Sequence, residues 1–242
     1  MSGSEIGDTD LSPRHPLTPS PCQPADGLLS TRSGRIVLFL AVCCLGVSAF
    51  ITQIVLMREL LGAFSGNELV LGIVLGNWLL LTGVGASLGR TAPRLRNPLG
   101  VLIVAQVLVA LLPVAEVYLL RTLRDVVFTR GAEVGVTETV LSCFVLLAPY
   151  CLVAGYLLTL ASLVLASKKG PASIGQVYFL DNVGDVVGGL LFSFVLVTLL
   201  DHFRTLYVPA VLNLLFAGLV AMAAGRRALA AAVALLAEVS PW

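Results

Sequence analysis

Residues 69–88 read LVLGIVLGNWLLLTGVGASL, a run of twenty residues without a charged side chain. A helix of about 20 apolar residues is long enough to cross the hydrocarbon core of a bilayer, which is about 30 Å thick. Other runs along the chain have a similar length and composition. The sequence therefore predicts about six membrane spans, at Ile36–Met57, Leu69–Leu88, Leu99–Leu120, Val140–Ala166, Val177–Leu200 and Leu206–Ala224.

The composition of the whole chain supports this fold class. Hydrophobic residues make up 57% of the 242 positions and charged residues only 12%, about half the share in soluble domains. We therefore expect an all-α, polytopic transmembrane helix bundle whose main partner is the lipid bilayer. A net charge of +1 leaves no basic surface for nucleic acid. With only His15 and His202 and no C-x-x-C pair, we expect no metal site and no cofactor.

The chain divides into three parts. Residues 1–34 are rich in Pro, Ser, Thr and Asp, which predicts a disordered tail. Residues 35–225 form the predicted transmembrane domain, in which Arg121–Glu138 is the longest loop and has room for an interfacial helix. Residues 226–242 contain an apolar run too short to span. They are either a short interfacial helix or a truncated seventh span.

The distribution of Lys and Arg predicts the orientation. Nine of these residues lie next to the spans in the tail and in the second, fourth and sixth loops, against five on the opposite side. Because cytoplasmic loops carry the excess of positive charge, we expect a cytoplasmic N-terminus.

The segment GQVYFLDNVGDVVGGLLFSF (Gly175–Phe194) carries the main candidate site. Asp181 and Asp185 are four residues apart and so share one face of a helix. With entry at Gly175 they would lie roughly 9 Å and 15 Å along the axis. Such carboxylates either line a path for protons or cations, with Tyr178 and Asn182 beside them, or Asp181 reaches the interface and Asp185 is a protonated, hydrogen-bonded packing residue. Nearby small residues predict close helix packing, at Gly184, Gly188 and Gly189.

A second polar cluster spans the first predicted hairpin. Its members are Gln53, Arg58, Glu59, Asn67 and Glu68. Because the connection is short, we expect the end of the first span and the start of the second to lie side by side, with Arg58 paired to Glu59 or Glu68.

Three further features are expected to be structural. Gly72 and Gly76 form a small-xxx-small pair that predicts helix packing. Asn77 lies mid-span, where an amide commonly makes an interhelical hydrogen bond. Glu116 lies near the end of the third span, where we expect it to mark the membrane interface.

Three stretches together resemble bacterial membrane-bound spermidine synthase-like proteins, a polyamine aminopropyltransferase family. The stretch Phe50–Gly89 is similar to their first hairpin, and Leu147–Leu165 to their Pro-containing fourth span. The third stretch resembles their Tyr-x-x-Asp-x-x-Gly segment, with matching residues Tyr178, Asp181, Gly184, Gly188 and Gly189.

The resemblance implies a location in the bacterial inner membrane and a partner with enzymatic activity. In that family the membrane region precedes a cytoplasmic synthase domain that uses decarboxylated S-adenosylmethionine and putrescine. The glycine-rich cofactor loop and catalytic aspartates of that domain have no counterpart in this sequence, so we expect no catalytic residue here, and whether the chain belongs to an enzyme stays open.

Three functions follow as hypotheses. The first is a membrane module that anchors a polyamine-synthesis enzyme or supplies it with cationic substrate. The second is a structural or accessory subunit of a larger membrane complex. The third, a small transporter, is disfavoured because no internal repeat is evident in the sequence.

Overall fold

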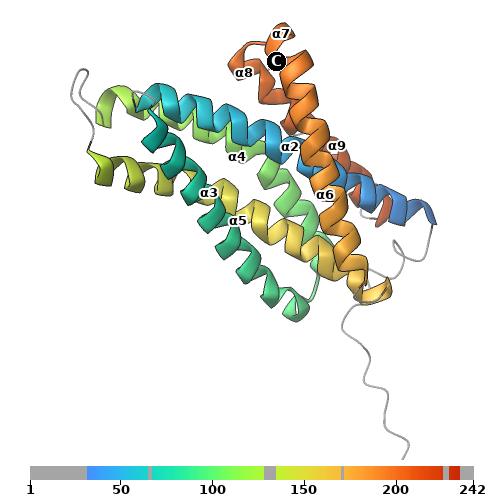
Figure 1. The fold of residues 1–242 in the computed structure, drawn as a ribbon. Helices are drawn as coiled ribbons and strands as arrows, with labels where there is room; N and C mark the ends of the chain where they lie inside the picture. Colours follow the sequence, from blue (N-terminus) through green and yellow to red (C-terminus); the bar gives the residue numbers. More distant parts are fainter. Residues whose placement is uncertain (1–31, 65–66, 128–134, 170–171, 226–228, 235–242) are drawn as a thin grey trace, which may run out of the picture.

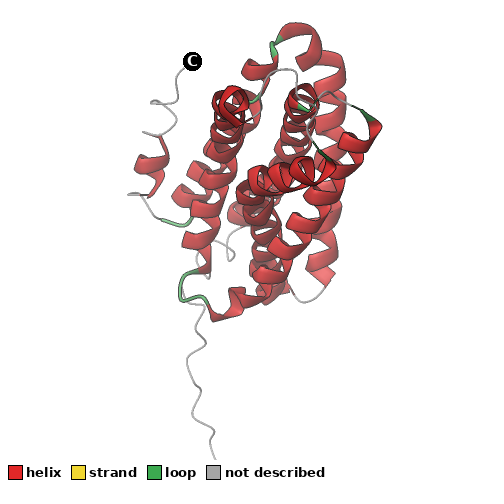
Figure 2. Ribbon diagram, turned by 90° about the vertical axis from the view of Figure 1, so that its left-hand side faces the viewer, coloured by secondary structure: helices red, strands yellow, loops and turns green. Residues whose placement is uncertain are grey.

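The computed structural model describes residues 32–64, 67–127, 135–169, 172–225 and 229–234. These residues form helices joined by short loops, and no strand occurs among them (Figure 2). The prediction of an all-α helix bundle is confirmed. The long helices are α2 (Arg32–Ala63), α3 (Glu68–Leu88), α4 (Pro98–Val127), α5 (Val136–Lys169) and α6 (Ala172–Leu191).

Shorter elements connect and complete these helices. A 3₁₀ turn, η2 (Gly89–Arg94), follows α3, and a π-helical turn, η3 (Phe192–Leu196), continues α6. The last elements of the chain are α7 (Val197–Leu199), α8 (His202–Thr205) and α9 (Tyr207–Ala223).

Five helical stretches are long and apolar enough to cross a membrane, which makes this a multi-pass membrane protein. They run from Arg32, Glu68, Pro98, Val136 and Ala172. The sixth predicted span corresponds to α9, which is apolar but has only 17 residues. At about 1.5 Å per residue, α9 is about 25 Å long, slightly less than the hydrocarbon thickness.

The helix pairs in the bundle are not the pairs that are adjacent in sequence. The closest partner of α2 is α6, and the closest partner of α3 is α5, whereas α2 and α3 touch only near their hairpin. The end of the first span and the start of the second therefore meet, while the rest of the two helices separate. Figure 1 shows α3 diverging from α2 and running along α5.

Helices α4 and α9 pack against each other and join the two pairs. Helix α4 also packs on α5, and α9 also packs on α2. Both helices carry buried polar side chains, Gln106 on α4 and Asn213 on α9. The core therefore contains polar groups as well as aliphatic ones.

The structure also bears on the predicted boundaries. Residues 32–34, which the sequence placed in the tail, belong to α2, while residues 1–31 lie outside the described residues. The long predicted loop is shortened at both ends, because α4 continues to Val127 and α5 begins at Val136. Its middle, 128–134, and with it the expected interfacial helix, lies outside the described residues. Near the C-terminus residues 229–234 are helical, and Val233 lies next to Gly218 of α9.

Candidate functional site

The two carboxylates of α6 lie near the middle of a long helical stretch. Helix α6 begins at Ala172, and with η3 and α7 it forms a continuous stretch of 28 residues, Ala172–Leu199. Asp181 and Asp185 therefore lie about 14 Å and about 20 Å from the start of this stretch, at about 1.5 Å per residue. Asp185 is at its midpoint. Both side chains are half-buried.

Glycines on both helices bring the α6 backbone into direct contact with α2 beside these carboxylates. A Cβ atom on Gly46 would overlap the Asp181 carbonyl and would lie 3.1 Å from the Asp185 nitrogen. In return, Gly184 lies against the Cys43 carbonyl and Gly188 against Val47, and Gly189 faces the ring of Phe50. Because only glycine leaves room for this approach, these residues fix the position of the acidic helix.

Asp181 lies at the junction of three helices. It is within electrostatic reach of Asp185 on its own helix, Cys43 on α2 and Tyr150 on α5. The ring of Tyr150 packs against Trp78 of α3 with centroids 5.4 Å apart. This junction therefore combines a carboxylate, a phenol and an indole.

The hydroxyl of Tyr150 is fully buried, approaches Thr52 of α2, and has no well-oriented hydrogen-bond partner among the described residues. Buried hydroxyl groups in proteins normally have a hydrogen-bond partner. This phenol is therefore free to contact a polar group that enters beside Asp181.

A third carboxylate, Glu116 of α4, is buried behind Tyr150. Its Oε1 accepts a hydrogen bond of 3.0 Å from the backbone N–H of Tyr150, and its Oε2 has no partner among the described residues. The preceding residue, Pro149, supplies no N–H to the α5 ladder, which makes this turn irregular. Glu116 is only 4% exposed. Its side chain is therefore packed inside the helix bundle.

Ser48 and Thr52 lie on one face of α2, because residues four apart share one helix face. The amide of Asn213 on α9 donates a hydrogen bond of 2.7 Å to the Ser48 hydroxyl and one of 3.0 Å to the Pro209 carbonyl. Its Oδ1 is buried without a partner in the described part of the chain. These side chains form a polar seam that runs from Asn213 on α9 through Ser48 and Thr52 on α2 to Tyr150 and Asp181.

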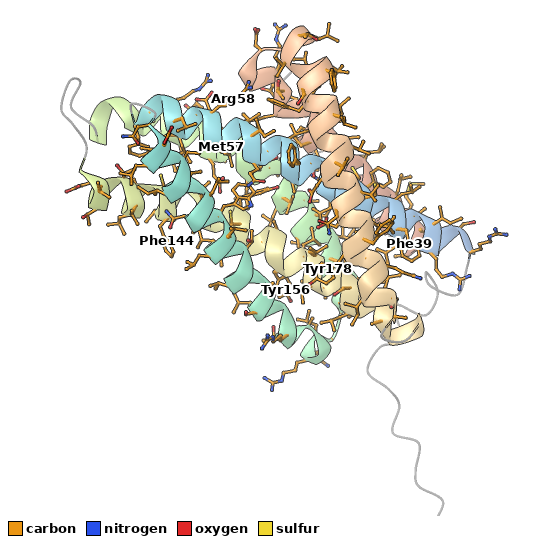
Figure 3. All side chains as sticks on the ribbon, viewed as in Figure 1. Phe39, Met57, Arg58, Phe144, Tyr156 and Tyr178 are labelled. Atoms are coloured by element: carbon orange, nitrogen blue, oxygen red, sulfur yellow. The ribbon has the colours of Figure 1, made fainter. Side chains whose placement is uncertain are left out.

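The other two residues proposed for ligand binding lie on the outer side of α6. Tyr178 and Asn182 are both exposed, and the Asn182 amide donates to the Tyr178 carbonyl over 2.7 Å. Figure 3 shows Tyr178 on the half of α6 that is nearer to its first residue. The structure therefore does not bring these two residues to the buried side of Asp181.

The hairpin cluster is divided among several contacts. Glu59 accepts hydrogen bonds from Arg121 of α4, with 3.2 Å between Nε and Oε2. Asn67 caps α3 by accepting from the Val70 N–H over 3.0 Å. Gln53 is half-buried and Glu68 is exposed.

Arg58 makes neither of its expected ion pairs. Its guanidinium lies 4.9 Å from the centroid of the Phe192 ring, at the π-helical turn of the α6 stretch, near the α7–α8 segment (Figure 3). Arg58 also lines a cavity of about 180 Å³ with Val55 and Thr205. A guanidinium within about 6 Å of an aromatic ring is attracted to the face of the ring, so Phe192 takes the place of a carboxylate as the contact of Arg58.

The glycine pair of α3 was expected to pack against another helix, and it contacts none among the described residues. Gly72 and Gly76 are exposed, and no described atom lies within 4 Å of the position that an added Cβ would take, so neither packs on a described helix of this chain. Gly85, further along the same helix, lies against the Leu152 carbonyl of α5 instead. Asn77 donates a hydrogen bond of 3.1 Å to the Val140 carbonyl of α5, as an interhelical amide should.

Sequence reasoning overlooked much of the polar seam. Ser48, Thr52 and Asn213 are uncharged and isolated in apolar runs, so they resemble ordinary packing residues. The spacing of Ser48 and Thr52 was the available signal, since it places two hydroxyls on one helix face. Gly46 was also overlooked, although it lies opposite the acidic pair.

Fold and site together define the class of this protein: a multi-pass, all-α membrane protein with acidic groups inside its helix bundle. No family model, no curated protein and no solved structure matches the chain.

Proposed function

We propose that this chain is a membrane module that binds a cationic amine of the polyamine type at Asp181 and Asp185. The observation that carries the proposal is the position of Asp181, half-buried and within electrostatic reach of the Tyr150 hydroxyl, which has no well-oriented partner among the described residues. Carboxylates at this depth are costly unless a positive group or a proton compensates them. A multivalent ammonium ion supplies such compensation, since opposite charges attract strongly at low dielectric constant.

The proposed biological role is based on the sequence resemblance to spermidine synthase-like proteins. We propose that the module anchors a cytoplasmic synthase domain or supplies it with cationic substrate, in the bacterial inner membrane and with its N-terminus in the cytoplasm. The arginines Arg32, Arg35, Arg90, Arg94 and Arg96, which flank α2, α3 and α4 on one side of the bundle, support this orientation.

Binding of radiolabelled spermidine to the purified protein tests the proposed site. Asp181→Asn and Asp185→Asn keep the side-chain shape and remove one charge each. We expect each to lower the affinity roughly tenfold, which corresponds to loss of one charge-assisted contact. Asp201→Asn is the matched control, because Asp201 is exposed at the end of the α6 stretch. Unchanged affinity in both variants would show that the pair does not bind the amine.

A second candidate function is that of an accessory subunit in a larger membrane complex. The exposed Gly72 and Gly76 favour it, because small residues on a lipid-facing surface allow another helix to approach closely. Gly76→Leu should then release a partner subunit or convert an oligomer to a monomer, as measured by native mass spectrometry. Gly175→Leu, at another open glycine, is the control.

A further inference from the structure

The α2/α6 and α3/α5 crossings have the same construction. At the first crossing, Gly46 of α2 lies against the Asp181 carbonyl of α6. At the second, Gly155 of α5 lies against the Thr82 carbonyl of α3. A Cβ atom on these glycines would also meet a backbone nitrogen at almost the same distance, 3.1 Å for Asp185 and 3.0 Å for Ala86.

The reciprocal contacts match as well. Gly184 of α6 lies against the Cys43 carbonyl of α2, and Gly85 of α3 lies against the Leu152 carbonyl of α5. In both crossings the second glycine therefore contacts the carbonyl located three residues before the first glycine. The two crossings are equivalent if α2 corresponds to α5 and α3 corresponds to α6.

The residue numbers support one register for this correspondence. Cys43 and Leu152 are separated by the same number of residues as Gly46 and Gly155. The residues of α3 and α6 are also related by one constant difference in residue number. Thr82 corresponds to Asp181, Gly85 to Gly184 and Ala86 to Asp185. In this register α3 and α6 share the pattern Leu-x-x-Val-Gly-x-x-x-Gly, at residues 81–89 and 180–188.

The corresponding helices run in opposite directions. Figure 1 shows α2 and α5 antiparallel, and likewise α3 and α6. Helices α4 and α9 complete the two halves, since they pack on each other while α4 packs on α5 and α9 on α2. The chain is thus built from two inverted halves, α2–α3–α4 and α5–α6–α9, although the sequence alone showed no repeat.

The interlocked halves create two rigid pairs with a polar site between them. Backbone-to-backbone contacts at the glycines hold α2 to α6 and α3 to α5. Tyr150 belongs to the α3/α5 pair. Its buried hydroxyl has no well-oriented partner in the described part of the chain, approaches Thr52 and lies within electrostatic reach of Asp181, both in the α2/α6 pair. The equivalents of Asp181 and Asp185 in the first half are the uncharged Thr82 and Ala86, so the carboxylate pair of α6 has no counterpart on α3.

We propose that the chain transports an organic cation by rocking the α2/α6 pair against the α3/α5 pair, which exposes the site at Asp181 and Tyr150 to each side of the membrane in turn. Inverted repeats with a substrate site at mid-membrane depth are the common construction of transporters that work by alternating access. The proposal rests on the amine-binding function proposed above and adds movement of the bound cation.

The test is exchange of radiolabelled spermidine into liposomes that contain the purified protein and unlabelled spermidine, with binding measured in parallel on the same preparation. We expect exchange above that of protein-free liposomes. Tyr150→Phe, which keeps the ring on Trp78, should slow exchange roughly tenfold, as expected for one lost hydrogen bond to a charged ligand. Tyr178→Phe, on the outer side of α6, should leave exchange unchanged.

Three results would overturn the transport proposal. Asp-dependent binding without exchange would leave an amine-binding module that does not transport. Absence of both binding and exchange would remove the proposed function as well. Exchange that is as fast in Tyr150→Phe and Asp181→Asn as in the unmodified protein would show that the cation does not pass through the proposed site between the helix pairs.

Discussion

The Glu116 carboxylate on α4 accepts a hydrogen bond of 3.0 Å from the backbone N–H of Tyr150 on α5. This contact joins the third helix to the turn that follows Pro149. It also holds Tyr150, whose hydroxyl approaches Thr52 of α2. The position of the candidate ligand group therefore depends on a buried side chain from a different helix.

Replacing Glu116 tests this dependence. Glu116→Ala leaves the Tyr150 N–H without its acceptor and should destabilise the protein by about 1–3 kcal/mol. Glu116→Gln keeps a carbonyl oxygen at the same position and should retain most of the stability. Thermal unfolding in detergent compares the two variants. Equal losses for Gln and Ala would mean that the hydrogen bond contributes little.

The Ser48–Asn213 contact should couple α2 to α9. A double-mutant cycle with Ser48→Ala and Asn213→Leu should give a coupling of about 0.6–1 kcal/mol, the usual size for polar contacts between membrane helices. Asn182→Ala is the comparison, because this exposed amide bonds only within its own helix among the described residues. Additive effects of the Ser48 and Asn213 substitutions would argue against the contact.

The glycine crossings should be far more sensitive than the open glycines. Gly184→Leu would push a branched side chain into the α2 backbone at Cys43, and Gly155→Leu would do the same to α3 at Thr82. Both variants should be produced at low level or elute as aggregates. Gly83→Leu, where an added Cβ would have no described atom within 4 Å, should resemble the unmodified protein. Normal behaviour of either crossing variant would contradict the close packing.

Orientation can be checked by cysteine labelling in a variant without the native cysteines. Cysteines at Ser30 and Ala172 should react only with reagent on the cytoplasmic side, because the excess of Lys and Arg lies there. A cysteine at Asp201, at the opposite end of the α6 stretch, should react only from outside. Labelling in the reverse pattern would show that the bundle has the opposite orientation in the membrane.

The sequence predicted the candidate carboxylates but not their surroundings. Asp181 and Asp185 stand out because charged residues are rare in apolar segments. Arg58 was assigned to the wrong partners because nearness in sequence suggested Glu59 and Glu68, whereas the fold places Phe192 beside it and Arg121 beside Glu59. Tyr150 and Glu116 lie on different helices, 34 residues apart, and no spacing rule connects them.

The sequence by itself determined that the chain is a bundle of membrane-spanning helices and where most of those helices lie. Hydropathy over about 20 residues is a local property, and a backbone in lipid must satisfy its hydrogen bonds within the helix. Only the tertiary structure decided that α2 pairs with α6 and α3 with α5, and so revealed the inverted halves. Most residues on every face of these helices are apolar, so hydropathy alone does not distinguish the packed face from the lipid-facing one. The packed face is determined instead by close backbone contact at Gly46, Gly85, Gly155 and Gly184.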